Sequence, residues 1–145
     1  MKILVLCTGN SCRSQMAEAF LRSFDPRIEA HSAGSRPAAR VNPYAVRAMA
    51  EVGLDLSQGR PKSVDEFLGQ AIDFVVTVCG NARDECPAFI GQVGERLHLG
   101  FDDPADATGT DEEVMEVFRA SRDEIREGFH RFYEEKVLPK LEERS

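Results

Sequence analysis

The stretch KILVLCTGNSCRSQMAEAF, residues 2–20, decides the fold because it joins a strand-like run to a helix-like run through one short loop. Residues 2–7 are apolar and rich in branched side chains, which is typical of a strand buried in a parallel sheet. Residues 13–23 carry apolar side chains at helical spacing, namely Met16, Ala17, Phe20 and Leu21. The stretch therefore predicts a strand, a short loop and a helix.

The rest of the chain repeats this alternation of strand and helix. Three further segments are expected to be strands: residues 28–34, 72–78 and 95–101. Helix starts are marked by capping residues, namely Asn42 before Pro43, Ser63 with Glu66, and Thr110 with Glu113. We expect the helix after Asn42 to stop at Gly53, and Pro139 to end or kink the last helical region.

Alternating strands and helices predict an α/β fold built on one parallel sheet with right-handed crossovers. The length of 145 residues suits a single domain over residues 1–145 with one core. In such sheets, ligands bind beyond the carboxyl ends of the strands. Cys7 and Cys79 each follow at the end of a predicted strand, so the two thiols should face the same crevice.

Composition and charge narrow the classes of function. Hydrophobic residues make up 42% and charged residues 30%, and the net charge of -7 argues against a nucleic-acid partner. No segment is long and apolar enough for a membrane span, and the start MKILVLC is too short for a signal peptide. We therefore expect a cytoplasmic protein, and a monomer, whose four cysteines are catalytic, redox-active or metal-binding rather than structural disulfides.

The loop between the first strand and the first helix has the properties of an anion site. Backbone N–H groups ahead of a helix can converge on one anion, and the helix N-terminus adds positive potential there. Arg13 offers a planar fork of donors that suits a tetrahedral oxyanion, and Gly9 permits a backbone turn that other residues resist. The same field favours the thiolate form of Cys7, which is a nucleophile.

The remaining polar residues of the loop are expected to support this site. Asn10 and Ser14 can fix the loop and form hydrogen bonds with the Cys7 sulfur. The candidate substrate-binding residues are Thr8, Gly9, Asn10, Ser11, Cys12, Arg13 and Ser14. A Walker loop is excluded because Gly-Lys-Ser/Thr is missing, and a dinucleotide fingerprint is excluded because its glycines are missing.

The loop CTGNSCRS resembles the phosphate-binding loop of the low-molecular-weight protein tyrosine phosphatases, and still more that of their relatives, the thioredoxin-coupled arsenate reductases. The phosphatases usually carry a proline after the Arg-Ser pair, whereas the continuation QMAE is similar to the reductases. Further similar segments follow in order: SAG (32–34), VNPYAVRAM (41–49), VVTVCGNARDECP (75–87) and GFDDPA (100–105). The resemblance covers most of the chain and implies a flavodoxin-like three-layer sandwich around a four-stranded parallel sheet.

The resemblance implies reduction of arsenate to arsenite by a relay of three cysteines, with phosphate or sulfate as mimics of arsenate in the loop. Cys7 would form a thiol–arsenate adduct, and Cys79 would attack Cys7 as arsenite leaves. Cys86 would then attack Cys79, and thioredoxin would reduce the resulting Cys79–Cys86 disulfide. Because Cys79 must reach two partners in turn, we expect segment 80–86 to be mobile.

Two other functions remain open. A tyrosine phosphatase would use Cys7 as its nucleophile, although the segment PADATG lacks the tyrosines with which these phosphatases usually grip an aromatic substrate. A metal- or thiol-based sensor would use the cysteines with His31, His98 or His130, but the spacings Cys-x4-Cys and Cys-x6-Cys fit zinc patterns poorly. We therefore expect no metal and no cofactor. Cys12 is either an inert buried thiol or a partner that protects Cys7 from oxidation.

The resemblance also suggests a general acid. The aspartate immediately before a proline has this role in the family, which corresponds to Asp103 before Pro104. It would protonate the oxygen that leaves when the nucleophile attacks. Asp102 is the alternative.

Some of the reductases bind potassium near the loop, and three of their ligands correspond to Asn10, Glu18 and Ser32. The fourth ligand, an aspartate, falls on or near Lys62. We expect the Lys62 ammonium to replace the ion and to pair with Glu18, which makes a potassium site doubtful. Asp65 is a weaker candidate for the missing ligand.

Overall fold

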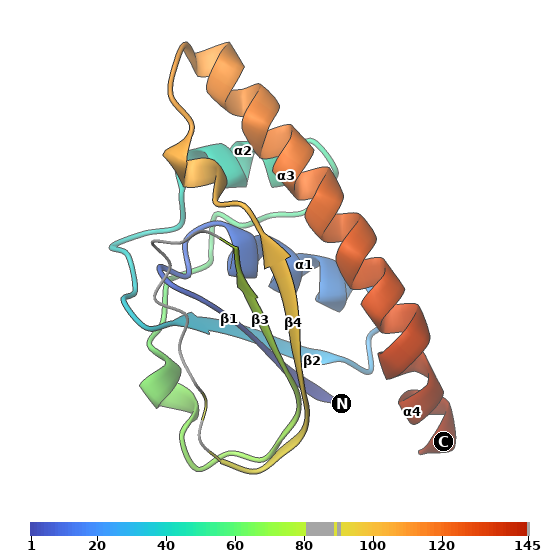
Figure 1. Ribbon diagram of the computed structural model, residues 1–145. Coiled ribbons are helices and arrows are strands. Elements are labelled where there is room, and N and C mark those ends of the chain that lie inside the picture. Colours follow the sequence, from blue (N-terminus) through green and yellow to red (C-terminus); the bar gives the residue numbers. More distant parts are fainter. Residues whose placement is uncertain (81–88, 90, 145) are drawn as a thin grey trace.

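The structure is a computed structural model, and it describes residues 1–80, 89 and 91–144. Its sheet has four parallel strands: β1 (Lys2–Cys7), β2 (Glu29–Gly34), β3 (Ile72–Cys79) and β4 (Val93–Phe101). Their order is β2-β1-β3-β4, the flavodoxin-like order (Figure 1). The expected α/β fold with a four-stranded parallel sheet is confirmed, and each strand starts and ends within two residues of its prediction.

The helices are α1 (Arg13–Phe24), α2 (Pro43–Ala50), α3 (Asp111–Phe132) and α4 (Leu138–Glu143), with short 3-10 turns η1 (Val64–Phe67) and η2 (Pro104–Asp106). Asn42 caps α2 as predicted, because its side chain accepts a hydrogen bond from the Tyr44 N–H. Thr110 and Glu113 form the predicted reciprocal capping box at the start of α3. In Figure 1, α3 runs along one side of the sheet beside α1 and α2.

The structure refines two expectations about helix boundaries. Ser63 caps η1 as expected, but its hydroxyl accepts a hydrogen bond from the Asp65 N–H, and Glu66 also forms an ion pair with Arg60. Of the two outcomes expected for Pro139, it does not end the C-terminal helical region, but the α-helix is interrupted just before it by a π-helical turn, η3 (Tyr133–Val137), which leads into α4. The wider turn directly before Pro139 accommodates its ring and its missing N–H.

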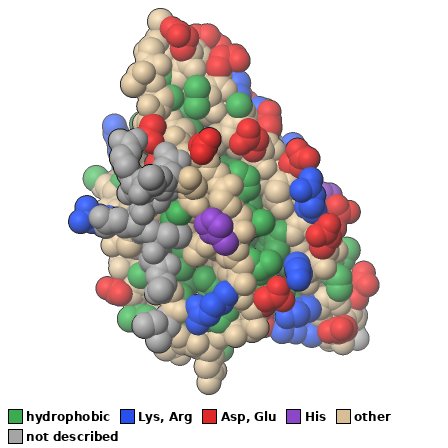
Figure 2. All heavy atoms as spheres, viewed as in Figure 1, with side chains coloured by type: hydrophobic (Ala, Val, Ile, Leu, Met, Phe, Trp, Pro, Cys, Tyr) green, Lys and Arg blue, Asp and Glu red, His purple; other side chains and the backbone are tan. Residues whose placement is uncertain are grey.

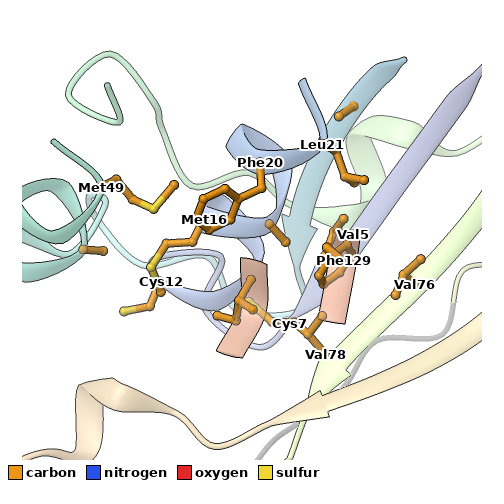
Figure 3. Close-up of a cluster of buried hydrophobic side chains, with 14 of the residues drawn as sticks. Val5, Cys7, Cys12, Met16, Phe20, Leu21, Met49, Val76, Val78 and Phe129 are labelled. Carbon is orange, nitrogen blue, oxygen red and sulfur yellow. The ribbon is translucent and has the colours of Figure 1, made fainter. Parts of the chain in front are cut away.

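The two faces of the sheet carry separate apolar clusters. On one face, the helices α1, α2, α3 and α4 pack over a large cluster that includes Val5, Phe20, Val76 and Phe129 (Figure 3). The smaller cluster on the other face consists of Leu4, Leu6, Ala33, Phe67, Ile72, Val75 and Phe89. Because both clusters include residues of β1, this strand is buried on both faces, which explains its continuous apolar run.

The outer side of α3 is a charged, solvated surface. Figure 2 shows acidic and basic side chains interspersed along this side of the molecule. Ion pairs such as Arg119–Glu51 and Arg122–Glu51 join α3 to the end of α2. Within the described part of the chain, no helix combines the length and apolarity needed to cross a membrane.

The four parallel strands end at one edge of the sheet, and this edge positions the candidate site. Cys7 pairs in register with Gly34, and Cys79 pairs with Phe101, so each strand contributes its last residue to the edge. Because β1 and β3 are neighbours, Cys7 and Cys79 lie on adjacent strands, which agrees with the expectation that both follow a strand at one edge of the sheet.

Candidate active site

Cys7 is buried at the end of β1, and its sulfur is held by the loop that follows. The Ser14 hydroxyl oxygen lies 2.8 Å from the sulfur, and the Asn10 N–H donates to the sulfur at 3.2 Å. Asn10 Nδ2 donates to the Ser14 hydroxyl oxygen at 2.8 Å, which leaves the hydroxyl hydrogen free to point at the sulfur. The loop therefore fixes the position of the Cys7 sulfur through contacts with two of its residues.

Asn10 organises the loop from within. It is fully buried and has a φ of 52°, a left-handed conformation that asparagine tolerates better than most residues. Its side-chain oxygen accepts hydrogen bonds from the Lys62 N–H at 2.9 Å and from Gln15 Nε2 at 3.1 Å. Gln15 Nε2 also donates to the Asn10 carbonyl oxygen at 3.2 Å and to the Arg60 carbonyl oxygen at 3.1 Å. The loop is therefore tied to the segment around residues 60–62.

Gln15 and Gly34 are two supporting residues that the sequence reasoning missed. Gln15 is 1% exposed, although its type is usually found at the surface. An added Cβ on Gly34 would overlap the Thr8 carbonyl oxygen, so only glycine lets β2 approach the loop this closely. Two features of the sequence could have revealed them: Gln15 is an uncharged polar residue beside the apolar positions of the helix, and Gly34 is a glycine at the end of a strand.

Arg13 begins α1 and is 2% exposed. Its Nη1 donates to the Phe101 carbonyl oxygen at 3.0 Å, and its Nη2 lies 3.5 Å from Asp103 Oδ2. Asp103 Oδ1 accepts a hydrogen bond from the Ala105 N–H at 3.0 Å, which fixes the carboxylate at the start of η2. The structure thus brings Asp103 to the guanidinium, whereas Asp102 is exposed.

Cys12 lies in the same loop but in a different environment. It is buried in the large apolar cluster, and Figure 3 shows its side chain pointing away from Cys7. Burial raises the pKa of the Cys12 thiol to about 12, against a weak opposing hydrogen bond with the Ser11 hydroxyl at 3.7 Å. A thiol of this kind is protonated at neutral pH, which favours the prediction of an inert buried cysteine over that of a protective partner.

Cys79 ends β3 and is 7% exposed. It is disulfide-bonded in the structure, and neither Cys7 nor Cys12 is its partner because both are free thiols. Cys86 lies outside the described residues, as does the predicted mobile segment apart from Gly80. The site therefore combines a free thiol on β1 with an oxidised cysteine on the adjacent strand.

The four supporting residues, Asn10, Glu18, Ser32 and Lys62, come together behind the loop. The Ser32 hydroxyl donates to Glu18 Oε1 at 3.2 Å, and Arg22 forms an ion pair with the same oxygen at 3.8 Å. The Lys62 ammonium donates to the Arg60 carbonyl oxygen at 3.0 Å, and the structure gives it no ion pair with Glu18. Burial lowers the pKa of Lys62, and the charge of Glu18 opposes this shift. The Lys62 ammonium thus bonds to a carbonyl oxygen while the charge of Glu18 acts on it, and its replacement of a cation stays a prediction.

The three histidines are distributed over the fold with separate partners. His31 contacts Glu29 at 2.8 Å, His98 contacts the Thr77 hydroxyl at 2.7 Å, and His130 contacts Glu134 at 3.2 Å. Among the described residues, no three or more side chains of His, Cys, Asp or Glu gather as a metal site. Asp65, the alternative potassium ligand, lies in η1.

Comparisons with known proteins agree with this geometry. The sequence profile of the family described as low molecular weight phosphotyrosine protein phosphatase matches residues 2–144. A protein of Halalkalibacterium halodurans named arsenate reductase is 52% identical over 124 residues, which cover 85% of this chain and 88% of that protein.

Two solved structures extend the comparison to the fold. An arsenate reductase in the phosphate binding state has a TM-score of 0.74 and 31% identity, over 90% of this chain and 95% of that one. A thioredoxin-dependent arsenate reductase of Corynebacterium glutamicum has a TM-score of 0.57 and 26% identity, over 89% of this chain and 61% of that one.

Proposed function

The chain belongs to the low molecular weight phosphotyrosine protein phosphatase family, and from that premise we propose that it is an enzyme that reduces arsenate to arsenite. The observation that carries this proposal is that two cysteines in different redox states lie at the same edge of the sheet. Cys7 sits in an anion-binding type of loop as a free thiol, and Cys79 on the adjacent strand is disulfide-bonded. Hydrolysis of a phosphate ester needs the first of these cysteines, and only a redox reaction needs the second.

The proposed first step uses the loop and the acid. Arsenate binds to the backbone N–H groups of residues 8–13 and to the Arg13 guanidinium, as an anion does at a helix N-terminus. The Cys7 thiolate attacks arsenic, and an arsenic–sulfur bond forms while one oxygen leaves. Asp103, 3.5 Å from Arg13, gives this oxygen the proton with which it departs as water.

The proposed second step transfers two electrons. The Cys79 thiolate attacks the Cys7 sulfur, so that a sulfur–sulfur bond forms as the arsenic–sulfur bond breaks. The electron pair of the broken bond stays on arsenic, which leaves as arsenite. Cys86 then attacks Cys79 and releases the Cys7 thiolate. A disulfide at Cys79 beside a free Cys7 is the pattern that this scheme gives after one turnover.

Thioredoxin is the proposed electron donor, because its dithiol returns two electrons and two protons to the disulfide. The thioredoxin-dependent relative from Corynebacterium glutamicum supports this choice. Donor and relay both need reduced thiols, so we place the reaction in the cytoplasm. We further propose that residues 1–145 act as one domain and as a monomer, with arsenate as substrate and with no metal or cofactor.

The deciding experiment follows arsenite formation and NADPH consumption by the protein with arsenate, thioredoxin and thioredoxin reductase. We expect arsenite to form with one NADPH oxidised per arsenate, and one equivalent of arsenate alone to remove two free thiols. If the protein instead hydrolyses aryl phosphates efficiently and loses no thiol on arsenate, it is a tyrosine phosphatase that uses Cys7. A low residual phosphatase activity is compatible with the reductase, since both reactions use the same loop.

A further inference from the structure

Phe101, the last residue of β4, has contacts that the proposed reaction does not use. Its carbonyl oxygen accepts the 3.0 Å hydrogen bond from Arg13 Nη1. Its ring stacks on Phe129 of α3 with a centroid distance of 6.2 Å. Its main chain pairs in register with Cys79, next to the irregularity in the ladder between Thr77 and Cys79. Phe101 thus lies between the guanidinium of the loop and the oxidised cysteine.

Gly80 follows Cys79 and lies directly against the Phe101 main chain. A Cβ added to Gly80 would lie 2.5 Å from the Phe101 carbonyl oxygen and 2.7 Å from its carbonyl carbon, closer than real Cβ atoms come. A Cβ added to Gly100 would lie 3.2 Å from the Cys79 carbonyl oxygen. The main chain beside Cys79 and the peptide that holds Arg13 therefore pack on each other with no side chain between them.

We propose that Gly80 and Phe101 are positioning residues for Arg13, and that the Phe101 peptide couples anion binding in the loop to the redox state of Cys79. The inference rests on the proposed function only in taking Cys79 as a cysteine that changes redox state. Neither residue needs to touch the anion for this coupling. The carbonyl oxygen of Phe101 sets where one amino group of the buried guanidinium lies, and Gly80 sets where that carbonyl oxygen lies.

The disulfide gives the coupling its direction. While Cys79 is covalently tethered, Gly80 is restrained against the Phe101 peptide, and Arg13 keeps its hydrogen bond to that peptide. Reduction removes the tether, so Gly80 and the peptide sample more positions and Arg13 is less well placed for an anion. By thermodynamic linkage, a bound anion stabilises the disulfide by the same factor by which the disulfide tightens the anion.

The first test compares two glycine variants by calorimetric titration with inorganic phosphate. Gly80→Ala should raise the dissociation constant of phosphate about tenfold, because it displaces the Phe101 peptide. Gly94→Ala is the matched control, since its Cβ would lie 2.6 Å from the Asp73 carbonyl oxygen between the same two strands, away from the site. The control should bind phosphate within about twofold of the wild type despite a comparable loss of thermal stability.

Equal phosphate affinity in Gly80→Ala and the wild type would overturn the proposal, as would an equal loss of affinity in both variants. The second test needs no variant, and it decides the matter if Gly80→Ala does not fold. Wild-type protein is titrated with phosphate in two forms, one fully reduced and one with Cys79 in its disulfide and Cys7 free, verified by peptide mapping.

We expect the disulfide form to bind phosphate about fivefold more tightly, a coupling of ordinary size between two sites. Equilibration with dithiothreitol should then show the reciprocal effect. In that exchange the protein disulfide gains two electrons and two protons, and dithiothreitol becomes its cyclic disulfide. Saturating phosphate should shift the equilibrium constant by the same factor toward the oxidised protein. Equal affinities of the two forms, or tighter binding by the reduced form, would overturn the proposal.

These measurements use neither arsenate nor thioredoxin. A protein that couples phosphate to the Cys79 disulfide but forms no arsenite would refute the proposed function and leave the inference standing. A protein that forms arsenite but binds phosphate equally well in both redox states would support the proposed function and refute the inference.

Discussion

The two walls of the candidate site are held by different forces. The wall from Cys7 to Ser14 is a network of hydrogen bonds, in which Asn10 and Gln15 tie the loop to more distant main chain. The wall formed by the ends of β3 and β4 depends on close backbone packing, with Gly80 against Phe101. The first wall is therefore cross-linked by directional hydrogen bonds, whereas the described part of the second wall depends on contact between the Gly80 and Phe101 main chains, which changes if either chain moves. On our proposal, only the second wall makes the protein a reductase.

Removal of the Cys7 thiol should have the largest effect, because both activities depend on the first wall. We expect Cys7→Ser to lower arsenate reduction and aryl phosphate hydrolysis alike by at least about a thousandfold, since a serine hydroxyl is a far weaker nucleophile in this setting. Both activities are measured on protein whose fold is checked by circular dichroism. Substantial hydrolysis of p-nitrophenyl phosphate by this variant would show that another group is the nucleophile.

A change at Cys12, the other cysteine of the same loop, is the matched control for Cys7→Ser. Because burial raises the pKa of the Cys12 thiol to about 12, iodoacetamide at pH 8 should alkylate Cys7 and leave Cys12 unmodified. Cys12→Ala should keep both activities within about threefold of the wild type, since the side chain only fills the apolar cluster. A large loss of activity in Cys12→Ala would revive its assignment as a redox partner of Cys7.

The second wall is tested by Cys79→Ser, which should separate the two activities. Arsenate reduction should fall below detection because no thiol attacks Cys7, while aryl phosphate hydrolysis should stay within about threefold of the wild type. Steady-state assays of both reactions on one preparation give the comparison. Equal loss of both activities in a folded variant would contradict this division between the walls.

The sequence predicts much of this arrangement for specific physical reasons. The apolar runs of β1 and β3 reveal strands buried on both faces, and parallel strands must end at one edge, which places Cys7 and Cys79 together. Local signals such as the Thr110 capping box are equally readable, because they depend on neighbours within one turn.

Other features escape the sequence because they depend on contacts between distant segments. Gln15 bonds to the main chain of Arg60, 45 residues away, and no local pattern encodes that partner. The contact of Gly80 with Phe101 depends on the register of β3 with β4. The Lys62 ammonium donates to the Arg60 carbonyl oxygen, and the bend of the chain that brings these two groups together follows only from the folded loop.

Gln15 allows a smaller test of the hydrogen-bonded wall. Its Nε2 has three acceptors in the loop and at Arg60, so Gln15→Ala should lower the free energy of unfolding by about 1–3 kcal/mol and weaken phosphate binding several-fold. The matched control is Gln70→Ala, whose Nε2 donates to the Glu66 carbonyl oxygen in an exposed turn. Its free energy of unfolding should change by less than about 0.5 kcal/mol in urea unfolding. Equal effects of the two variants would show that Gln15 does not hold the loop.

The smallest expected effect concerns potassium behind the first wall. The Lys62 main chain bonds to both Asn10 and Gly34, and the charge of Glu18 favours the protonated ammonium of Lys62 against the effect of burial, so we expect a positive charge near the place where a cation would bind. Two positive charges at one site repel, so replacing sodium by potassium at constant ionic strength should change KM for arsenate by less than about twofold. Lys62→Met removes the charge and keeps the length of the side chain, and this variant should gain a potassium response. Lys2→Met, at a lysine that pairs with Glu29, is the control and should gain none. A several-fold fall in KM with potassium in the wild type would mean that the cation binds despite Lys62. Asp65, the alternative ligand, would then be the next residue to mutate.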